Sequence, residues 1–280
     1  MKLRLLPAFL VACGILLSVQ HAKAEPQAEP RAVQLRPAVT VLLETLHNQS
    51  RAEGREGSAN FGVGKLKEVL EKSGAEVSNT LSLLNTVPAP QRRLNLDLLS
   101  RFDVVISNGR YPLASTPIIE LFYKEEVEAL DEYMKQGGIL FITCAGATLG
   151  FGCEPPLYNP MLQNFGVQVA FDDIKGAPEV QAVKNMKHPL MEGLPALRPM
   201  FPTSLVVTNQ EAKILYKLDG RPMMVLIPRG KGALIVAGGG SGWMNQGIEM
   251  NASSCTEPQK KFLKNLVEWV GRKDAMGLPK

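Results

Sequence analysis

The sequence predicts an α/β protein, with a mainly parallel sheet, helices on both of its faces and an antiparallel extension in the C-terminal half. Two observations predict this class. In the first half, short runs of Leu and β-branched residues alternate with segments whose apolar residues follow the helical period, which is typical of a parallel sheet covered on both faces. In the second half, strand-like runs follow one another and a glycine-containing turn joins two of them.

The first half alternates strands and helices. VTVLLETL at residues 39–46 is typical of a strand buried on both faces. The segment 61–77 has apolar residues at helical spacing and Gly74 after its last turn, which predicts a helix followed by a second strand. FDVVIS at residues 102–107 predicts a third strand.

A longer helix and a fourth strand come next. KEEVEALDEYMKQGG at residues 124–138 has acids in its first turn, one apolar stripe and a stop at Gly137-Gly138, so it predicts a helix packed on the sheet. ILFIT follows at once and predicts a strand that delivers the chain to Cys144.

The second half contains more strands than helices. Its strand-like runs are VQVAF, SLVVT, KILYKL, PMMVLIP and ALIVAGGG. The turn Arg229-Gly230-Lys231-Gly232 joins the last two of them, which predicts a hairpin and an antiparallel extension of the sheet. The glycines at 238–240 predict a close backbone turn at a strand end. EPQKKFLKNLVEWVGR predicts a final helix whose apolar face includes Phe262, Leu266 and Trp269.

The N-terminus has the three parts of a secretory signal. MKLRLLPAFLVACGILLSVQHAKA has a basic start, an apolar stretch and small residues at its end, so we expect a signal peptide at 1–24 with cleavage after Ala24. A lipoprotein reading of residues 10–13 is less favoured, because the apolar run continues beyond Cys13.

The remaining chain is expected to form one domain. Residues 25–37 are rich in Pro and Ala and predict a disordered lead-in. A single α/β domain is expected at 38–272, with a tail at 273–280. We expect a periplasmic or secreted protein without stable membrane insertion after cleavage, since no later segment has the apolar length of a membrane helix.

Charge and histidine content exclude several functions. The chain of 280 residues has 31 Lys and Arg against 27 Asp and Glu, and three of the basic residues belong to the signal, which leaves a balance of 28 to 27. A nucleic-acid partner is therefore not expected. The mature chain has two histidines, His47 and His188, far apart in sequence, so neither a metal site nor a cofactor is predicted.

Candidate ligand-binding residues follow the predicted strands. In open α/β sheets, ligands bind at the carboxyl ends of the parallel strands. Glu44 and Ser241 also lie at strand ends, but the residues that we expect to line one cleft there are His47, Asn48, Asn108, Tyr111, Trp243 and Asn245.

Several short motifs resemble a known group of proteins. They are Leu46-His47-Asn48, Asp103-Val104-Val105-Ile106, the helix that ends in Gly137-Gly138, HPLMEGL at 188–194, and Gly230-Lys231-Gly232 before ALIVAGGG. The chain from about Val39 to Val270 resembles the class I glutamine amidotransferase-like superfamily, in its ThuA-like and related extracytoplasmic branches. The resemblance implies a flavodoxin-like three-layer sandwich and a small polar ligand, carbohydrates included.

The resemblance raises the question of catalysis. In catalytic members a Cys lies on a strained turn within Gly-x-Cys-x-Gly, and a His follows a late strand. Cys144-Ala145-Gly146 matches the second half of the turn, but GGGSGWMNQG after the last strand contains no histidine. We therefore predict a non-catalytic domain that binds a small polar ligand or a protein partner. The alternative is a cysteine-dependent hydrolase or amidotransferase-like enzyme with Cys144 as nucleophile and His47 as base.

The remaining histidine and the cysteines have other interpretations. His188 is favoured as a loop residue that hydrogen-bonds the backbone. The mature chain has three cysteines, so if two of them form a disulfide in an oxidising compartment, the third keeps a free thiol. A Cys153–Cys255 disulfide is slightly favoured over Cys144–Cys153, and the connectivity stays open.

Overall fold

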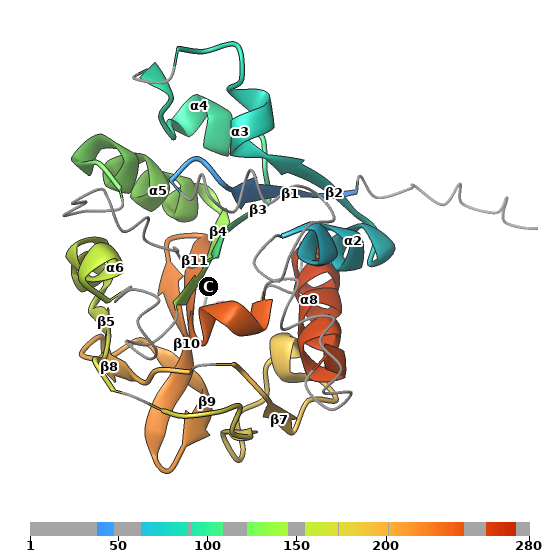
Figure 1. Ribbon diagram of the computed structural model, residues 1–280, viewed down its shortest axis with the longest axis vertical. Coiled ribbons are helices and arrows are strands. Elements are labelled where there is room, and N and C mark those ends of the chain that lie inside the picture. Colours follow the sequence, from blue (N-terminus) through green and yellow to red (C-terminus); the bar gives the residue numbers. More distant parts are fainter. Residues whose placement is uncertain are drawn as a thin grey trace, which may run out of the picture. The chain divides into compact units, whose positions relative to one another are not determined.

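A nine-stranded mixed sheet crosses the described part of the protein (Figure 1). The structure is a computed structural model that describes residues 38–47, 63–88, 91–108, 122–144, 155–172, 174–200, 202–243 and 256–272. The expected signal peptide, lead-in and C-terminal tail lie outside these residues, so the domain boundaries stay predictions. None of the described helices combines the length and the apolar character that a membrane crossing requires.

Parallel strands form one half of the sheet, in the order β2-β1-β3-β4-β11. Their bounds are β1 (Val39–Glu44), β2 (Ala75–Asn79), β3 (Val104–Asn108), β4 (Ile139–Cys144) and β11 (Gly232–Gly238). The strands predicted in the first half are present, with small shifts at their ends. β-Branched residues and Leu dominate β1, β3 and β4, because a parallel sheet covered by helices buries both faces of each strand.

Antiparallel strands extend the sheet beyond β11, as predicted. They follow in the order β10 (Arg221–Arg229), β9 (Lys213–Leu218), β6 (Val180–Ala182) and β7 (Ala196–Leu197). Gly230, with φ of +59°, lies in the turn that joins β10 to β11. A positive φ is unfavourable for residues that have a side chain, so glycine suits this position. The extension includes β6 and β7, which the sequence did not indicate because such short strands show no alternation.

Two of the predicted strands belong to a different sheet. β5 (Val167–Val169) and β8 (Leu205–Val207) pair with each other in a two-stranded antiparallel sheet instead of extending the main one. The side chain of Asn159 accounts for this at β5: its Oδ1 accepts from the Val169 N–H at 2.7 Å, and its Nδ2 donates to the Val169 carbonyl at 3.0 Å. These bonds satisfy backbone groups that another strand would otherwise pair.

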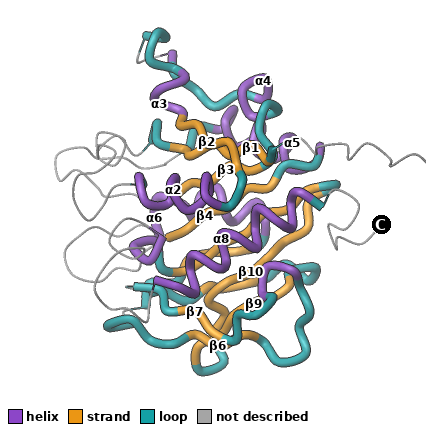
Figure 2. Tube along the Cα trace, turned by 90° about the vertical axis from the view of Figure 1, so that its right-hand side faces the viewer, coloured by secondary structure: helices purple, strands orange, loops and turns teal. Residues whose placement is uncertain are grey.

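Helices pack against both faces of the main sheet. Their bounds, with those of the short 3₁₀ turns, are α2 (Gly64–Lys72), α3 (Thr80–Leu83), α4 (Leu96–Leu99), α5 (Lys124–Gln136), α6 (Pro155–Leu162), η3 (Gln163–Phe165), η4 (Pro189–Met191), η5 (Gly240–Trp243) and α8 (Thr256–Gly271). Phe141 and Ile235 belong to a core cluster with residues of α2 and α8, and Leu140 and Leu234 belong to one with residues of α4, α5 and α6. Figure 1 shows α5 and α6 on one side of β4 and β11, and Figure 2 shows α2 and α8 on the other. The protein is therefore α/β, as predicted.

The glycines after β11 permit a close approach of two backbone segments. A Cβ on Gly238 would lie 1.8 Å from the carbonyl oxygen of Thr203, and one on Gly239 would lie 2.4 Å from Cβ of Pro199. Gly239 also has φ of +132°. The predicted close turn at this strand end is confirmed, and it allows Pro199 and Thr203 to lie directly against the end of β11.

Candidate functional site

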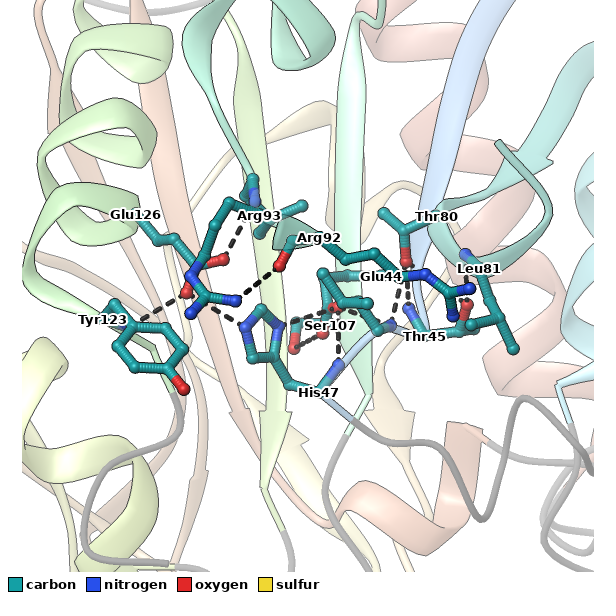
Figure 3. A network of polar contacts seen from close by, with 12 residues as sticks. Glu44, Thr45, His47, Thr80, Leu81, Arg92, Arg93, Ser107, Tyr123 and Glu126 are labelled. Carbon is teal, nitrogen blue, oxygen red and sulfur yellow. Dashed lines mark hydrogen bonds and ion pairs between the residues drawn. The ribbon is translucent and has the colours of Figure 1, made fainter. Parts of the chain in front are cut away.

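A largely buried histidine lies between two buried carboxylates just past the end of β1 (Figure 3). His47 Nδ1 is 3.0 Å from Glu44 Oε1, and His47 Nε2 is 3.0 Å from Glu126 Oε2. The side chains of Glu44 and Glu126 are 1% and 0% exposed, and that of His47 is 10% exposed. These three residues are called the Glu–His–Glu triad below.

The Glu44 carboxylate folds back over the turn that follows β1. Its Oε1 accepts hydrogen bonds from the backbone N–H groups of Leu46 at 2.8 Å and His47 at 3.1 Å. The hydroxyl of Ser107, its register partner on β3, donates to Oε2 at 3.4 Å. Glu44 thus shapes the turn that carries His47 and also contacts its ring.

Glu126 comes from the first turn of α5. Its Oε2 accepts from the backbone N–H of Tyr123 at 3.0 Å, and its Oε1 accepts from that of Leu94 at 2.9 Å. A carboxylate is favourable here, because the first N–H groups of a helix lack partners within the helix and the helix dipole is positive at this end. Through Glu126 the triad joins β1, α5 and the segment before α4.

Burial and charge act in opposite directions on the triad. Burial by itself would lower the pKa of His47, but the negative charge of Glu44 and hydrogen bonds to Glu126 and Glu44 outweigh it and raise the pKa from 6.5 to about 10. Burial would raise the pKa of Glu126, but the hydrogen bond and charge of His47 and the N–H groups of Leu94 and Tyr123 hold it below its ordinary value. At neutral pH the triad therefore contains an imidazolium, and the carboxyl group of Glu126 is ionised.

This state decides what His47 can do chemically. A protonated imidazole has two N–H donors and no lone pair, and here each donor faces a carboxylate. A general base must accept a proton near the operating pH, which an imidazole with a pKa of about 10 does not do. The triad is a buried ion-pair network that connects β1, α5 and the segment before α4 and stabilises their packing.

The triad does not form a metal site. The imidazole lies between the carboxylates and separates them, whereas metal ligands converge on one point. Across the described ranges, no group of three or more His, Cys, Asp or Glu residues could hold a metal ion.

A second polar cluster lies on the opposite face of the sheet. Asn108 follows Ser107 on β3, so its side chain points the other way. Its Nδ2 donates to the carbonyl of Trp243 at 3.0 Å, and its Oδ1 accepts from the hydroxyl of Thr143. Asn108 and Thr143 are 5% and 0% exposed. This cluster joins the ends of β3 and β4 to η5.

The predicted ligand-binding residues are divided among these places. The structure brings Asn108 and Trp243 together, whereas His47 lies across the sheet in the triad. Asn48, Tyr111 and Asn245 lie outside the described residues, so their place in the cleft stays a prediction.

Cys144 is the last residue of β4 and is fully buried. It belongs to the core cluster that contains Leu140 and Ile142 of the same strand and residues of α5 and α6. Cys153 and Cys255 lie outside the described residues, so the disulfide connectivity stays a prediction.

His188 has the structural role that the sequence favoured. It precedes η4, and its Nδ1 accepts from the backbone N–H of Leu190 at 3.3 Å. Burial, and next the charge of Lys213, lower the pKa of His188 to about 4, so its ring is neutral at physiological pH.

Sequence reasoning missed Glu126, Ser107 and Thr143. The only local signal was at Glu126, an acid three residues after Tyr123 at a helix start, which is the capping-box position. Nothing local pairs it with His47, which lies 79 positions away in the chain.

Comparisons with known proteins identify the fold and leave the family open. No family model matches the chain, and no curated protein matches its sequence significantly. Among solved structures, the mmIFT52 N-terminal domain is 16% identical with a TM-score of 0.57, over 83% of this chain and 97% of that one. The cytoplasmic protein STM1381 from Salmonella typhimurium LT2 is 14% identical with a TM-score of 0.54, over 83% and 99% of the two chains.

A ThuA-like protein from Bacteroides uniformis ATCC 8492 also aligns. It is 14% identical with a TM-score of 0.49, over 89% of this chain and 95% of that one. At such low identities the alignments with TM-scores above 0.5 show a shared α/β fold and nothing of activity.

Proposed function

We propose that this protein is an exported, non-catalytic α/β domain that binds a small polar ligand, carbohydrates included, or a protein partner at the carboxyl ends of its parallel strands. The state of His47 carries the proposal. Both of its ring nitrogens face carboxylates and its pKa is raised to about 10, so it is a poor base for Cys144. A nucleophilic thiol is activated by a base that takes its proton, and His47 in this state does not supply that base.

The proposal includes a flavodoxin-like three-layer architecture in the ThuA-like branch of the amidotransferase-like superfamily. The order β2-β1-β3-β4-β11 supports it, because flavodoxin-like sheets have the order 2-1-3-4-5. In such sheets the ligand crevice opens where the strand order reverses, between β1 and β3. Glu44 and Ser107, the register partners at this point, are polar.

The proposed contacts divide into a floor and a rim. Asn108 and Trp243 are buried and in contact, so they would form the floor of the cleft, and the nearly buried His47 would border it from the other face of the sheet. Asn48, Tyr111 and Asn245 are the proposed direct contacts with the ligand. Export remains part of the proposal and depends on the expected signal at residues 1–24.

A thermal-shift screen of the mature chain tests the binding proposal. Mono- and disaccharides and other polar metabolites are screened, and any hit is repeated on Asn108→Ala and on Asn265→Ala. Asn265 is the matched control. It is a buried Asn on α8, and its side chain donates hydrogen bonds to the carbonyls of Leu190 and Glu192. We expect the hit to raise the Tm of the wild type and of Asn265→Ala, and to have a much smaller effect on Asn108→Ala. Equal shifts in both variants would count against a site at the carboxyl ends.

Thiol alkylation tests the non-catalytic part separately. The folded protein is treated with iodoacetamide at pH 7, and the modified cysteines are mapped by peptide mass spectrometry. We expect Cys144 to react only after denaturation, since it is fully buried. Rapid alkylation of Cys144 in the folded protein would contradict the proposal and favour a cysteine-dependent hydrolase or amidotransferase.

A further inference from the structure

Two buried polar atoms beside one small pocket have no hydrogen-bond partner among the described residues. They are the indole Nε1 of Trp243 and the amide Oε1 of Gln259. Both residues line the same pocket, and they are 2% and 1% exposed. An indole N–H only donates and an amide oxygen only accepts, so the pair offers one donor and one acceptor. Leaving a buried polar group without a partner is unfavourable and rare in folded proteins, so two such groups beside one pocket require an explanation.

Contacts outside the pocket fix both side chains. Gln259 Nε2 donates to the carbonyl of Arg198 at 2.7 Å. A flipped amide would place two oxygens against each other, so Oε1 is the atom left without a partner. The Trp243 ring packs edge-on against Phe141 and Phe262, with centroid distances of 5.2 Å each. The donor and the acceptor are therefore held in place before any ligand enters.

The pocket suits a small neutral group. Its cavity volume is about 10 Å³, close to the minimum of roughly 10–15 Å³ that one water molecule requires. Among the described residues, those that line it carry no charge, and they include Leu197, Met223 and Met224. An ion here would lack a counter-charge and would lose its hydration, which is costly. The methionines can adjust to carbon atoms attached to the bound group.

We propose that this pocket is a hydroxyl-binding subsite for a small neutral alcohol or polyol. The hydroxyl oxygen accepts a hydrogen bond from Trp243 Nε1, and its proton is donated to Gln259 Oε1. The pocket as it stands has room for the hydroxyl group alone, so the carbon atoms enter only if the side chains of Met223 and Met224 move aside. A water molecule takes the place of the hydroxyl group when no alcohol is present. The inference stands whether or not the carboxyl ends of the strands bind a ligand, because it depends only on the groups of this pocket.

The indole N–H of Trp243 provides the readout. The chain has two tryptophans, so its ¹H–¹⁵N spectrum contains two indole resonances, which Trp243→Phe or Trp269→Phe assigns. Ethanol and glycerol are the hydroxyl probes, acetate and ethylammonium are charged comparators, and xenon is the apolar comparator. We expect ethanol or glycerol to shift the Trp243 resonance saturably, with far weaker responses to the two ions and to xenon.

Variants decide whether the hydroxyl is recognised. Gln259→Met keeps the side-chain length and removes the acceptor, so we expect the apparent Kd for the alcohol to rise about tenfold. Gln163→Met, the same substitution at an exposed position of η3, is the matched control and should leave the Kd unchanged. Ala237→Val narrows the pocket and keeps both polar groups, so we expect it to abolish the shift of the Trp243 resonance with alcohol. This second variant still tests the proposal if Gln259→Met does not fold.

Three results would overturn the proposal. The first is the absence of any saturable shift of the Trp243 resonance with either alcohol. The second is an equal response to xenon that Gln259→Met does not change, which would identify an apolar cavity only. The third is a long-lived water at the indole N–H, seen by water–protein cross-relaxation, without any response to alcohol.

Discussion

Two groups of buried polar side chains, on opposite faces of the sheet, differ in how completely their hydrogen bonds are satisfied. On the α5 face, each carboxylate of the Glu–His–Glu triad has several donors, and both ring nitrogens of His47 have an acceptor. On the α8 face, Trp243 and Gln259 each keep one buried atom without a partner among the described residues. A saturated cluster has nothing left to offer a ligand, so it stabilises the fold. A pair of buried groups without partners is stabilised when a ligand hydrogen-bonds to them, so a binding site is expected there.

The largest effect is expected from removing the cation of the saturated cluster. His47→Gln leaves the carboxylates of Glu44 and Glu126 buried without a counter-charge. Breaking a buried ion pair in this way costs about 3–5 kcal/mol, so we expect the free energy of unfolding to fall by this amount in urea denaturation.

An exposed ion pair supplies the control for His47→Gln. Glu68→Gln removes a carboxylate that contacts Lys65 and Lys72 at the surface of α2 and should leave the urea midpoint nearly unchanged. A loss below about 1 kcal/mol in His47→Gln would show that the triad does not brace the fold.

The stability of the wild type should depend on pH through the triad. The pKa of folded His47 is raised from 6.5 to about 10, so its contribution is complete below pH 6.5 and is lost as the pH rises through about 10. The pKa of Glu126 is lowered from 4.5, so its contribution is complete above pH 4.5 and is lost as the pH falls. The low pKa of folded His188 also reduces stability as the pH falls below 6.5. We therefore expect a Tm maximum near pH 6.5 in melts from pH 4 to pH 10.

The variant His47→Gln isolates the alkaline limb of this profile. Lys and Tyr side chains also titrate near pH 10, so the quantity of interest is the difference in Tm between wild type and His47→Gln. We expect this difference to shrink as the pH rises from 6.5 to 10. A constant difference over that range would contradict the charged state assigned to His47.

The smallest effect on stability is expected at the unsaturated pair. Gln259→Met loses the hydrogen bond to the Arg198 carbonyl, worth about 1 kcal/mol, and also removes the unsatisfied Oε1. Because these changes oppose each other, we expect the free energy of unfolding to change by less than about 1 kcal/mol in the absence of alcohol. A loss as large as that of His47→Gln would mean that Gln259 serves the fold and would remove the contrast between the two faces.

Much of the fold was predictable, because its signals are local. The helical stripe of α5 and its glycine stop, the strands β1, β3 and β4, and the hairpin between β10 and β11 were all predicted from residues adjacent in the chain. The short strands β6 and β7 and the separate pairing of β5 with β8 were not, because two or three residues show no periodicity and the choice of partner depends on groups such as Asn159.

The sequence by itself determined the alternation of strands and helices, the close turn after β11 and the places where parallel strands end. Only the tertiary structure decided what the polar residues at these ends do. Ser107 and Asn108 are neighbours in the chain, but the pleat of β3 sends one to Glu44 and the other to the Trp243 carbonyl. His47 meets Glu126 across 79 positions, and Trp243 shares a pocket with Gln259 of a different helix. Such partners are set by how distant segments pack, and this packing leaves no pattern within any one segment.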